Sequence, residues 1–268
     1  MSLHKYQSKL NSEKKKIKEL PPEIYQTLTN LEKNLAARGL SHARILKYLI
    51  TLRKIYSWLQ KPFQEATKED LESLLQKIEE IKYSAWTKQN YRVILKRFYK
   101  WLRNTEQYPP EVSWIKTTIK RNEEKIPEQL LTAEEVKQLV YHANNLRDKA
   151  LIMLLYDSGG RISEVGTLKT SSITFQENYA LVTLQGKTGM RRIPITISVP
   201  YLQNWITNHP QKEEDTSLWV SLGTKHHLQP LSYSQIVKMI RGCAYRAKIK
   251  KRVYPHLFRH SIIKVSSG

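Results

Sequence analysis

The chain has 268 residues, and its 45 Lys and Arg against 24 Asp and Glu give a formal net charge of +21 at pH 7. This excess indicates a polyanionic partner, nucleic acid first and an anionic membrane surface second. The longest apolar run, residues 150–156, is too short for a bilayer span, and the N-terminal residues lack the apolar stretch of a signal peptide. The single cysteine, Cys243, excludes a disulfide framework and a cysteine-based zinc site, so we expect an intracellular, cytoplasmic protein.

The first half of the chain is predicted to be helical. Residues 1–20 are rich in lysine and predict a flexible or weakly helical basic arm. A first helix starts at Pro22 and ends before Gly39, a second covers 42–60, and a third starts with Thr67 as its N-cap. A fourth covers about 84–104. Short connections between these helices predict a small bundle over residues 21–106.

The fourth predicted helix has an apolar stripe and a basic face beside it. Its periodicity places Leu95 and Phe98 on the buried side. The basic face is formed by Lys88, Arg92, Lys96, Lys100 and Arg103. We interpret this face as a DNA-binding surface, because positive charge concentrated along one helix face matches the phosphate backbone.

A second domain is predicted after a proline-rich, charged linker at residues 107–128. It covers 129–268 and begins with a capping box formed by Thr132 and Glu135. A buried helix is expected over 147–157, then strands within 171–195 that form a hairpin around Gly186 and Gly189. Further helices are expected at about 198–208 and 232–247. The fold class is therefore mainly α, with a small antiparallel sheet in the second domain.

Charge is distributed unevenly along this second domain. From Thr216 to Gly268 the sequence has ten Lys and Arg and no Asp or Glu. A basic solvated surface is the alternative, but charge of one sign favours polyanion binding, because solvated helix faces usually alternate in sign. The residues that we expect to bind DNA here are Arg241, Arg246, Lys250, Lys251 and Arg252.

Two short motifs carry candidate catalytic side chains in the first part of this domain. In "DSGGRISEVGTL" (157–168), Arg161 follows two glycines and Glu164 lies one helical turn later. The alternative for this pair is an ordinary surface ion pair. In "QGKTGMRRIPI" (185–195), Lys187 lies at the hairpin turn, as an exposed turn lysine or as a proton donor whose pKa responds to neighbouring charge.

A third motif, "PHLFRHS" (255–261), places His256 and Arg259 on one face of a helix that Pro255 can open. The spacing of His256 and His260 also suits a metal. The absence of a neighbouring cysteine or carboxylate disfavours that alternative, so no metal is expected.

In their order and spacing, these three motifs resemble the tyrosine recombinase/integrase family, over about residues 20–265. The resemblance implies a helical, SAM-like core-binding domain followed by an α+β catalytic domain. It implies that Arg161 and Arg259 bind the scissile phosphate, that Lys187 protonates the leaving 5′ oxygen, and that His256 assists proton transfer. Glu164 matches an acidic position that organises the site. A 3′-phosphotyrosine intermediate conserves the phosphodiester energy, so neither ATP nor any other cofactor is expected.

The family's nucleophilic tyrosine follows the His-x-x-Arg motif, whereas the last tyrosine in this sequence is Tyr254. We therefore expect the 268 residues to stop short of the nucleophile and to be inactive in cleavage. Family members assemble as tetramers on DNA through a C-terminal element, so a monomer in solution is expected here. One alternative is a non-catalytic DNA-binding protein that occupies recombination sites. Another is a type IB topoisomerase, but the small helical first domain favours the recombinase.

Overall fold

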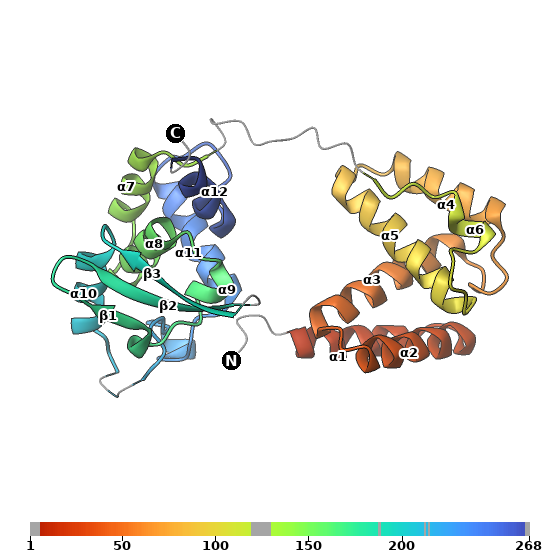
Figure 1. Ribbon diagram of the computed structural model, residues 1–268, viewed down its shortest axis with the longest axis horizontal. Coiled ribbons are helices and arrows are strands. Elements are labelled where there is room, and N and C mark those ends of the chain that lie inside the picture. Colours follow the sequence, from red (N-terminus) through yellow and green to blue (C-terminus); the bar gives the residue numbers. More distant parts are fainter. Residues whose placement is uncertain (1–5, 119–129, 187–188, 212, 214, 266–268) are drawn as a thin grey trace. The chain divides into compact units, whose positions relative to one another are not determined.

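The computed structural model describes residues 6–118, 130–186, 189–211, 213 and 215–265. The chain divides into two compact units, one formed by Lys5–Glu123 and the other including Glu124–Gly268. Figure 1 shows the first as a group of helices and the second as helices around a small sheet. The predicted fold class, mainly α with a small antiparallel sheet in the second unit, is confirmed.

The described residues of the first unit form six helices: α1 (Tyr6–Ile17), α2 (Pro22–Ala37), α3 (His42–Leu59), α4 (Lys68–Glu80), α5 (Ala85–Leu102) and α6 (Pro110–Ser113). Local sequence explains their ends. Gly39 follows α2 with φ +73°, in the left-handed region that glycine tolerates. The predicted capping box opens α4, where Asp70 accepts a hydrogen bond from the Thr67 backbone N–H at 2.8 Å. Leu28, Leu52 and Phe98 are fully buried in the core that these helices share.

The sequence predicted a flexible or weakly helical arm for residues 1–20; residues 1–5 lie outside the described residues, and over Tyr6–Ile17 the structure has helix α1 instead. Leu10 and Ile17 are buried against the core of the first unit, and α1 packs along α3. Between them Glu13 is 4% exposed and accepts a hydrogen bond from Arg53 of α3. The lysines dominate the composition, but they lie on the exposed side, so a narrow apolar stripe is enough to dock the helix.

The predicted linker, 107–128, includes α6. Val112 and Ile115 are buried in the core of the first unit, so the beginning of that range belongs to the helical bundle. The division between the two units, at Glu123 and Glu124, also falls inside the range.

The second unit contains α7 (Ala133–Tyr141), α8 (Leu146–Ser158), α9 (Ile162–Val165), β1 (Ile173–Phe175), β2 (Ala180–Gly186), β3 (Gly189–Ile195), α10 (Val199–Thr207), α11 (Tyr233–Arg246) and α12 (Pro255–Val265), with short 3-10 turns at Thr170–Ser172 and Thr224–His226. The sheet is antiparallel in the order β1-β2-β3, and Gly186 pairs with Gly189 at the hairpin end. Helix α8 is the centre of this unit: Leu151, Leu154 and Leu155 are fully buried, and α7, α10, α12 and β3 all pack against it. No helix in the described ranges is long and apolar enough to cross a membrane.

Candidate active site and nucleic-acid interface

The turn between α8 and α9 positions Arg161, and each of the two glycines in this turn is required for a different reason. Gly159 ends α8 with φ +55°, a left-handed conformation. Gly160 leaves no room for a side chain, since a Cβ there would lie 2.7 Å from Cγ2 of Val165. The chain therefore turns sharply, and Arg161 becomes the residue that precedes α9, with its side chain 40% exposed.

Glu164 is buried beneath this turn and binds two arginines. Its side chain is 1% exposed. Oε2 accepts from the backbone N–H of Arg161 at 2.9 Å, and Oε1 accepts from Nη1 of Arg161 at 3.0 Å. Arg191 of β3 donates from Nη1 to Oε1 at 3.0 Å and from Nη2 to Oε2 at 2.7 Å. The alternative of a surface Arg–Glu pair is therefore wrong, because the carboxylate is enclosed.

The charge of Glu164 is stabilised by these donors. The hydrogen bonds from Arg191 lower the pKa of Glu164 most, and the backbone and side chain of Arg161 lower it further, to about 2. Burial acts in the opposite direction but is outweighed. The carboxylate is thus ionised at neutral pH, with two guanidinium groups sharing it.

Gly186, the last residue of β2, lies directly against Glu164. A Cβ on Gly186 would come within 2.2 Å of Oε1 of Glu164, a distance that side chains do not tolerate. A glycine is therefore required for the hairpin to pass over the carboxylate. Lys187, the predicted proton donor, follows Gly186 in the chain but lies outside the described residues.

Helix α12 brings Arg259 to the same turn. Its Nη1 donates to the backbone carbonyl of Gly159 at 2.9 Å. Buried Ser261 holds the helix in place, since its hydroxyl accepts from the backbone N–H of Leu131 at 2.9 Å and donates to the carbonyl of Leu257 at 2.8 Å. The fold thus brings Arg161, Glu164 and Arg259 together from positions up to about a hundred residues apart.

His256 lies one turn before Arg259 on α12 and is exposed. The centroid of its ring is 6.5 Å from that of His260. Within the described part of the chain, no group of three or more His, Cys, Asp or Glu side chains is arranged to hold a metal ion.

Arg191 is the functional candidate that the sequence reasoning missed. The signal was present in the alternation of β3, where Arg191 shares a face with Ile193 and Ile195, whereas Arg192 faces solvent. An arginine on the inward face of a strand needs a buried acceptor, and Glu164 was already singled out nearby.

The predicted basic face of α5 makes many contacts inside the first unit. Lys88 and Arg92 bind Glu79 at the end of α4, and Lys96 donates to the carbonyls of Ser113 and Ile115, each at 2.9 Å. Arg103 binds Glu111 and the carbonyl of Gln64, and Lys100 lies over the ring of Tyr108. These cations hold α4 and α6 against α5.

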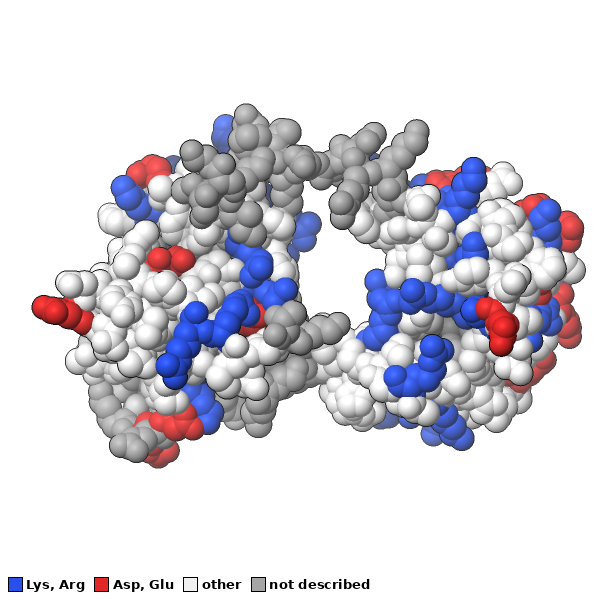
Figure 2. Space-filling model, in the orientation of Figure 1, with Lys and Arg blue, Asp and Glu red and all other residues white. Residues whose placement is uncertain are grey.

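A second group of cations in this unit surrounds Tyr48. Arg44 lies over the Tyr48 ring at 5.6 Å, and exposed Arg97 of α5 lies beside Tyr48, which raises the pKa of the Arg97 guanidinium. Lys47 is exposed on the same part of α3. We call Arg44, Lys47 and Arg97 the α3–α5 basic cluster, and Figure 2 shows Lys and Arg side chains gathered over these two helices.

The basic residues predicted in the second unit also divide into two groups. Arg246 donates to the carbonyl of His142, and Lys251 donates to the carbonyl of Leu130 and to Glu135, so both make intramolecular contacts. The others, Arg241, Lys250 and Arg252, are exposed.

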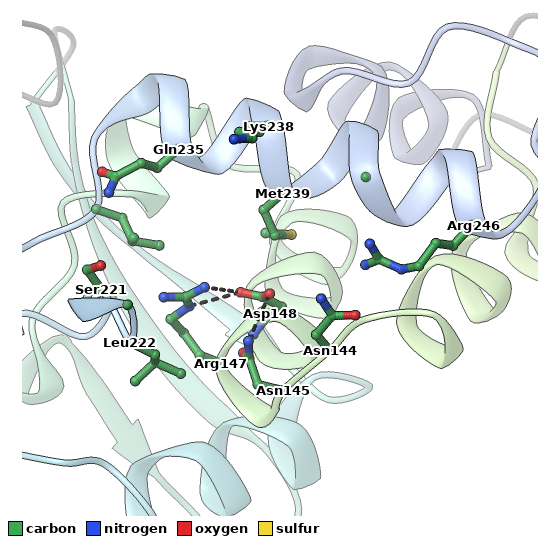
Figure 3. A pocket seen from close by; sticks show the side chains of 13 residues that line it. Asn144, Asn145, Arg147, Asp148, Ser221, Leu222, Gln235, Lys238, Met239 and Arg246 are labelled. Carbon is green, nitrogen blue, oxygen red and sulfur yellow. Dashed lines mark hydrogen bonds and ion pairs between the residues drawn. The ribbon is translucent and has the colours of Figure 1, made fainter. Parts of the chain in front are cut away.

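A separate open pocket of about 440 Å³ lies between the start of α8, residues 221–223 and α11. Figure 3 shows the Arg147–Asp148 ion pair inside it, where Nε and Nη2 of Arg147 donate to Oδ1 of Asp148. Nη1 of Arg147 donates to the carbonyl of Val220 at 2.7 Å. This pair ties α8 to the segment before α11, and none of the residues lining the pocket belongs to the Arg161 site.

Comparisons with known proteins agree with the motifs. The sequence pattern of the "Phage integrase family" matches residues 129–264, and that of the "Phage integrase, N-terminal SAM-like domain" matches 28–106. Tyrosine recombinase XerA of Pyrococcus horikoshii is 29% identical over 221 residues, 79% of this chain and 71% of that protein. A tyrosine recombinase of Thermosipho africanus is 35% identical over 141 residues, 51% of this chain and 47% of its own length. The chain thus spans about half the length of several relatives that it matches.

Solved structures share the fold. A lambda integrase dimer bound to a COC' core site matches with a TM-score of 0.68 at 17% identity, over 91% of this chain and 89% of that one. The XerH recombinase bound to its difH substrate, in a pre-cleavage complex, matches with a TM-score of 0.65 at 18% identity, over 96% and 83%.

Proposed function

The chain belongs to the phage integrase family, and from this premise we propose that it acts on duplex DNA as a site-specific recombinase. The observation that carries the proposal is the convergence of Arg161 and Arg259 on one turn, with Glu164 beneath it. Two guanidinium groups match the geometry of a phosphate and stay charged, so they can neutralise the negative charge that develops on a pentacovalent phosphorus.

Each residue then has a distinct part in the reaction. Arg161 and Arg259 bind the non-bridging oxygens of the scissile phosphate. His256, exposed one turn from Arg259, exchanges a proton with the phosphate, and Lys187 donates a proton to the leaving 5′ oxygen. Glu164 does not touch the phosphate; it orients Arg161. A tyrosine hydroxyl that attacks this phosphorus exchanges one phosphoester for another as the 5′ oxygen leaves, so the bond energy is conserved until the strand is rejoined. Residues 255–268 contain no tyrosine.

Duplex DNA is the proposed partner for both units. The XerH and lambda integrase structures with this fold are described as complexes with DNA. In the first unit we assign phosphate contacts to the α3–α5 basic cluster and to the residues of the α5 face other than Lys96, which are Lys88, Arg92, Lys100 and Arg103. In the second unit we assign them to Arg241, Lys250 and Arg252. The assembly on DNA is proposed to be a tetramer, as one solved lambda integrase assembly is, and the free chain a cytoplasmic monomer.

A salt titration of DNA binding tests this proposal. Fluorescence anisotropy with a labelled duplex should show affinity falling about 10³-fold or more between 50 and 200 mM salt, because several phosphate contacts each release counterions. The double variant Arg161→Met, Arg259→Met should keep most of this binding, since these two residues provide only part of the charge. A flat salt dependence would remove DNA as the partner.

A further inference from the structure

We propose that Arg191 is a positioning residue for Arg161. Arg191 binds the Glu164 carboxylate, so that the Arg161 guanidinium stays available to the scissile phosphate and does not form a bidentate ion pair with Glu164. The inference rests on the proposed function, because it takes a phosphate as the ligand of Arg161. It adds a residue of β3 to the site and gives the β2–β3 hairpin a part in placing the arginine.

Each carboxylate oxygen of Glu164 accepts two hydrogen bonds. Oε1 accepts from Nη1 of Arg161 and Nη1 of Arg191, and Oε2 accepts from the Arg161 backbone N–H and Nη2 of Arg191. Arg191 is therefore bidentate, whereas the Arg161 guanidinium contributes a single nitrogen. Within the described residues Arg161 makes no other side-chain hydrogen bond, so its remaining N–H groups are available to an anion.

The charges give the same conclusion. The described groups that face the Glu164 carboxylate are Arg161 at the start of α9, Arg191 from β3 and the backbone of Gly186 from β2. Two cations and one anion leave one net positive charge at the site. Without Arg191 the buried carboxylate would have only Arg161 as a partner, their charges would cancel, and Arg161 would be drawn into a bidentate pair.

The hairpin is attached to the same carboxylate through both of its strands. Gly186 of β2 packs against Oε1 of Glu164, and Arg191 of β3 binds both oxygens. Arg191 pairs with Leu184 across the β2–β3 ladder, so both attachments lie close to the end of the hairpin. One carboxylate thus fixes Arg161 and the strands that lead into and out of residues 187–188.

The test measures binding of inorganic sulfate to Arg161 in the whole chain. The NMR signal of the Arg161 side-chain Nε–H is assigned by its loss in Arg161→Lys. The change of this signal during a sulfate titration reports binding. Arg191→Met removes the bidentate partner. Arg192→Met is the matched control, because it removes the same charge from the next residue of β3, which is exposed.

We expect Arg191→Met to weaken sulfate binding at Arg161 at least tenfold, Arg192→Met by less than threefold, and Arg191→Lys by an intermediate factor. The double variant Glu164→Gln, Arg191→Met should bind within threefold of the original chain, because Arg161 no longer has a carboxylate to pair with.

Several outcomes would overturn the inference: equal losses in the two methionine variants, no recovery in the double variant, or no response of Arg161 to sulfate in the original chain. If Arg191→Met does not fold, Arg191→Lys and the double variant decide alone, because neither leaves Glu164 as an unpaired buried charge. DNA anisotropy on the original chain distinguishes failure of the proposed function from failure of this inference. If the original chain does not bind DNA, the proposed function is refuted. If it binds DNA but Arg191→Met and Arg192→Met weaken sulfate binding equally, only the role of Arg191 is refuted.

Discussion

Nη1 of Arg259, in α12, donates a hydrogen bond of 2.9 Å to the carbonyl oxygen of Gly159, two residues before Arg161. The contact joins the last described helix to the left-handed turn that ends α8. It occupies one guanidinium nitrogen of Arg259 and leaves the others for a ligand. The turn therefore serves both arginines: it sets the backbone of Arg161 and supplies the acceptor that aims Arg259.

Crystals grown in sulfate should contain one tetrahedral anion bound by both Arg161 and Arg259, with His256 within hydrogen-bonding distance. The shared turn is the reason, because Arg259 binds the carbonyl of Gly159 and Arg161 follows two residues later in the same turn. Crystallography at high resolution is the measurement. Guanidinium groups separated by more than roughly 10 Å cannot share one anion through hydrogen bonds of ordinary length, and that result would refute the assignment.

The stability of the second unit should depend on pH through Glu164. Its pKa is lowered from 4.5 to about 2 in the folded chain. Because the pKa is lower in the folded state, ionised Glu164 stabilises the fold at pH values above its unfolded-state pKa. This contribution is lost as the pH falls from about 4.5 through about 2. Its upper limit is about 3 kcal/mol. Urea unfolding at pH 5 and at pH 2 should show the stability gap between the original chain and Glu164→Gln narrowing by up to this amount. A gap that stays constant would mean that Glu164 is not held by its arginines.

Gly186→Ala should destabilise the second unit by about 1–3 kcal/mol, which is typical of overpacking. The added methyl group would meet a carboxylate oxygen at 2.2 Å, and Glu164 cannot retreat without breaking its four hydrogen bonds. Gly223→Ala is the control, because nothing lies within 4 Å of a Cβ there. Chemical denaturation of both variants gives the comparison, and equal stabilities would contradict the packing argument.

Local sequence rules were sufficient for most of the fold. Capping residues such as Thr67 and Thr132 start helices where the sequence predicted, and the glycines of the hairpin lie at its end. Arg161, Glu164 and Arg259 were also found from short motifs. The side-chain acceptors of these groups are tertiary contacts, and no local pattern specifies them.

Two features show where composition was misleading. In α1 the lysines concealed the apolar stripe of Leu10 and Ile17, because few buried residues are needed to dock a short helix. On α5 the sequence predicts charge but not its partners. Lys96 reaches carbonyls of Ser113 and Ile115, which are close only after α6 has folded back. A helical wheel therefore cannot separate cations that hold the bundle together from cations that face a ligand.

Lys96→Met and Lys47→Met should separate these two roles. Lys96→Met removes the donor of two carbonyls and should cost about 1–2 kcal/mol of stability while leaving the salt dependence of DNA binding unchanged. Lys47 is exposed, so Lys47→Met should change stability by less than about 0.5 kcal/mol. It should lower the slope of log affinity against log salt by about one, as expected for one lost phosphate contact. If Lys96→Met lowers the slope more than Lys47→Met does, Lys96 contacts phosphate and this division of roles is refuted.

A polypeptide of residues 1–268 should bind DNA without forming a covalent adduct, because the last three tyrosines before α12 are not suited to attack a phosphate held by Arg161 and Arg259. Residues 255–268 contain no tyrosine. Tyr254 and Tyr233 pack against the hydrophobic core of the second unit, and Tyr245 is 86% exposed on α11. Ser261 lies in α12, but its hydroxyl is buried and bonded to two backbone groups, so it has neither access nor a base. The assay is a nicked duplex whose cleavage releases a short strand and traps the enzyme–DNA bond. A denaturing gel should show no shifted protein band, whereas a trapped adduct would refute the prediction and peptide mapping would identify the nucleophile.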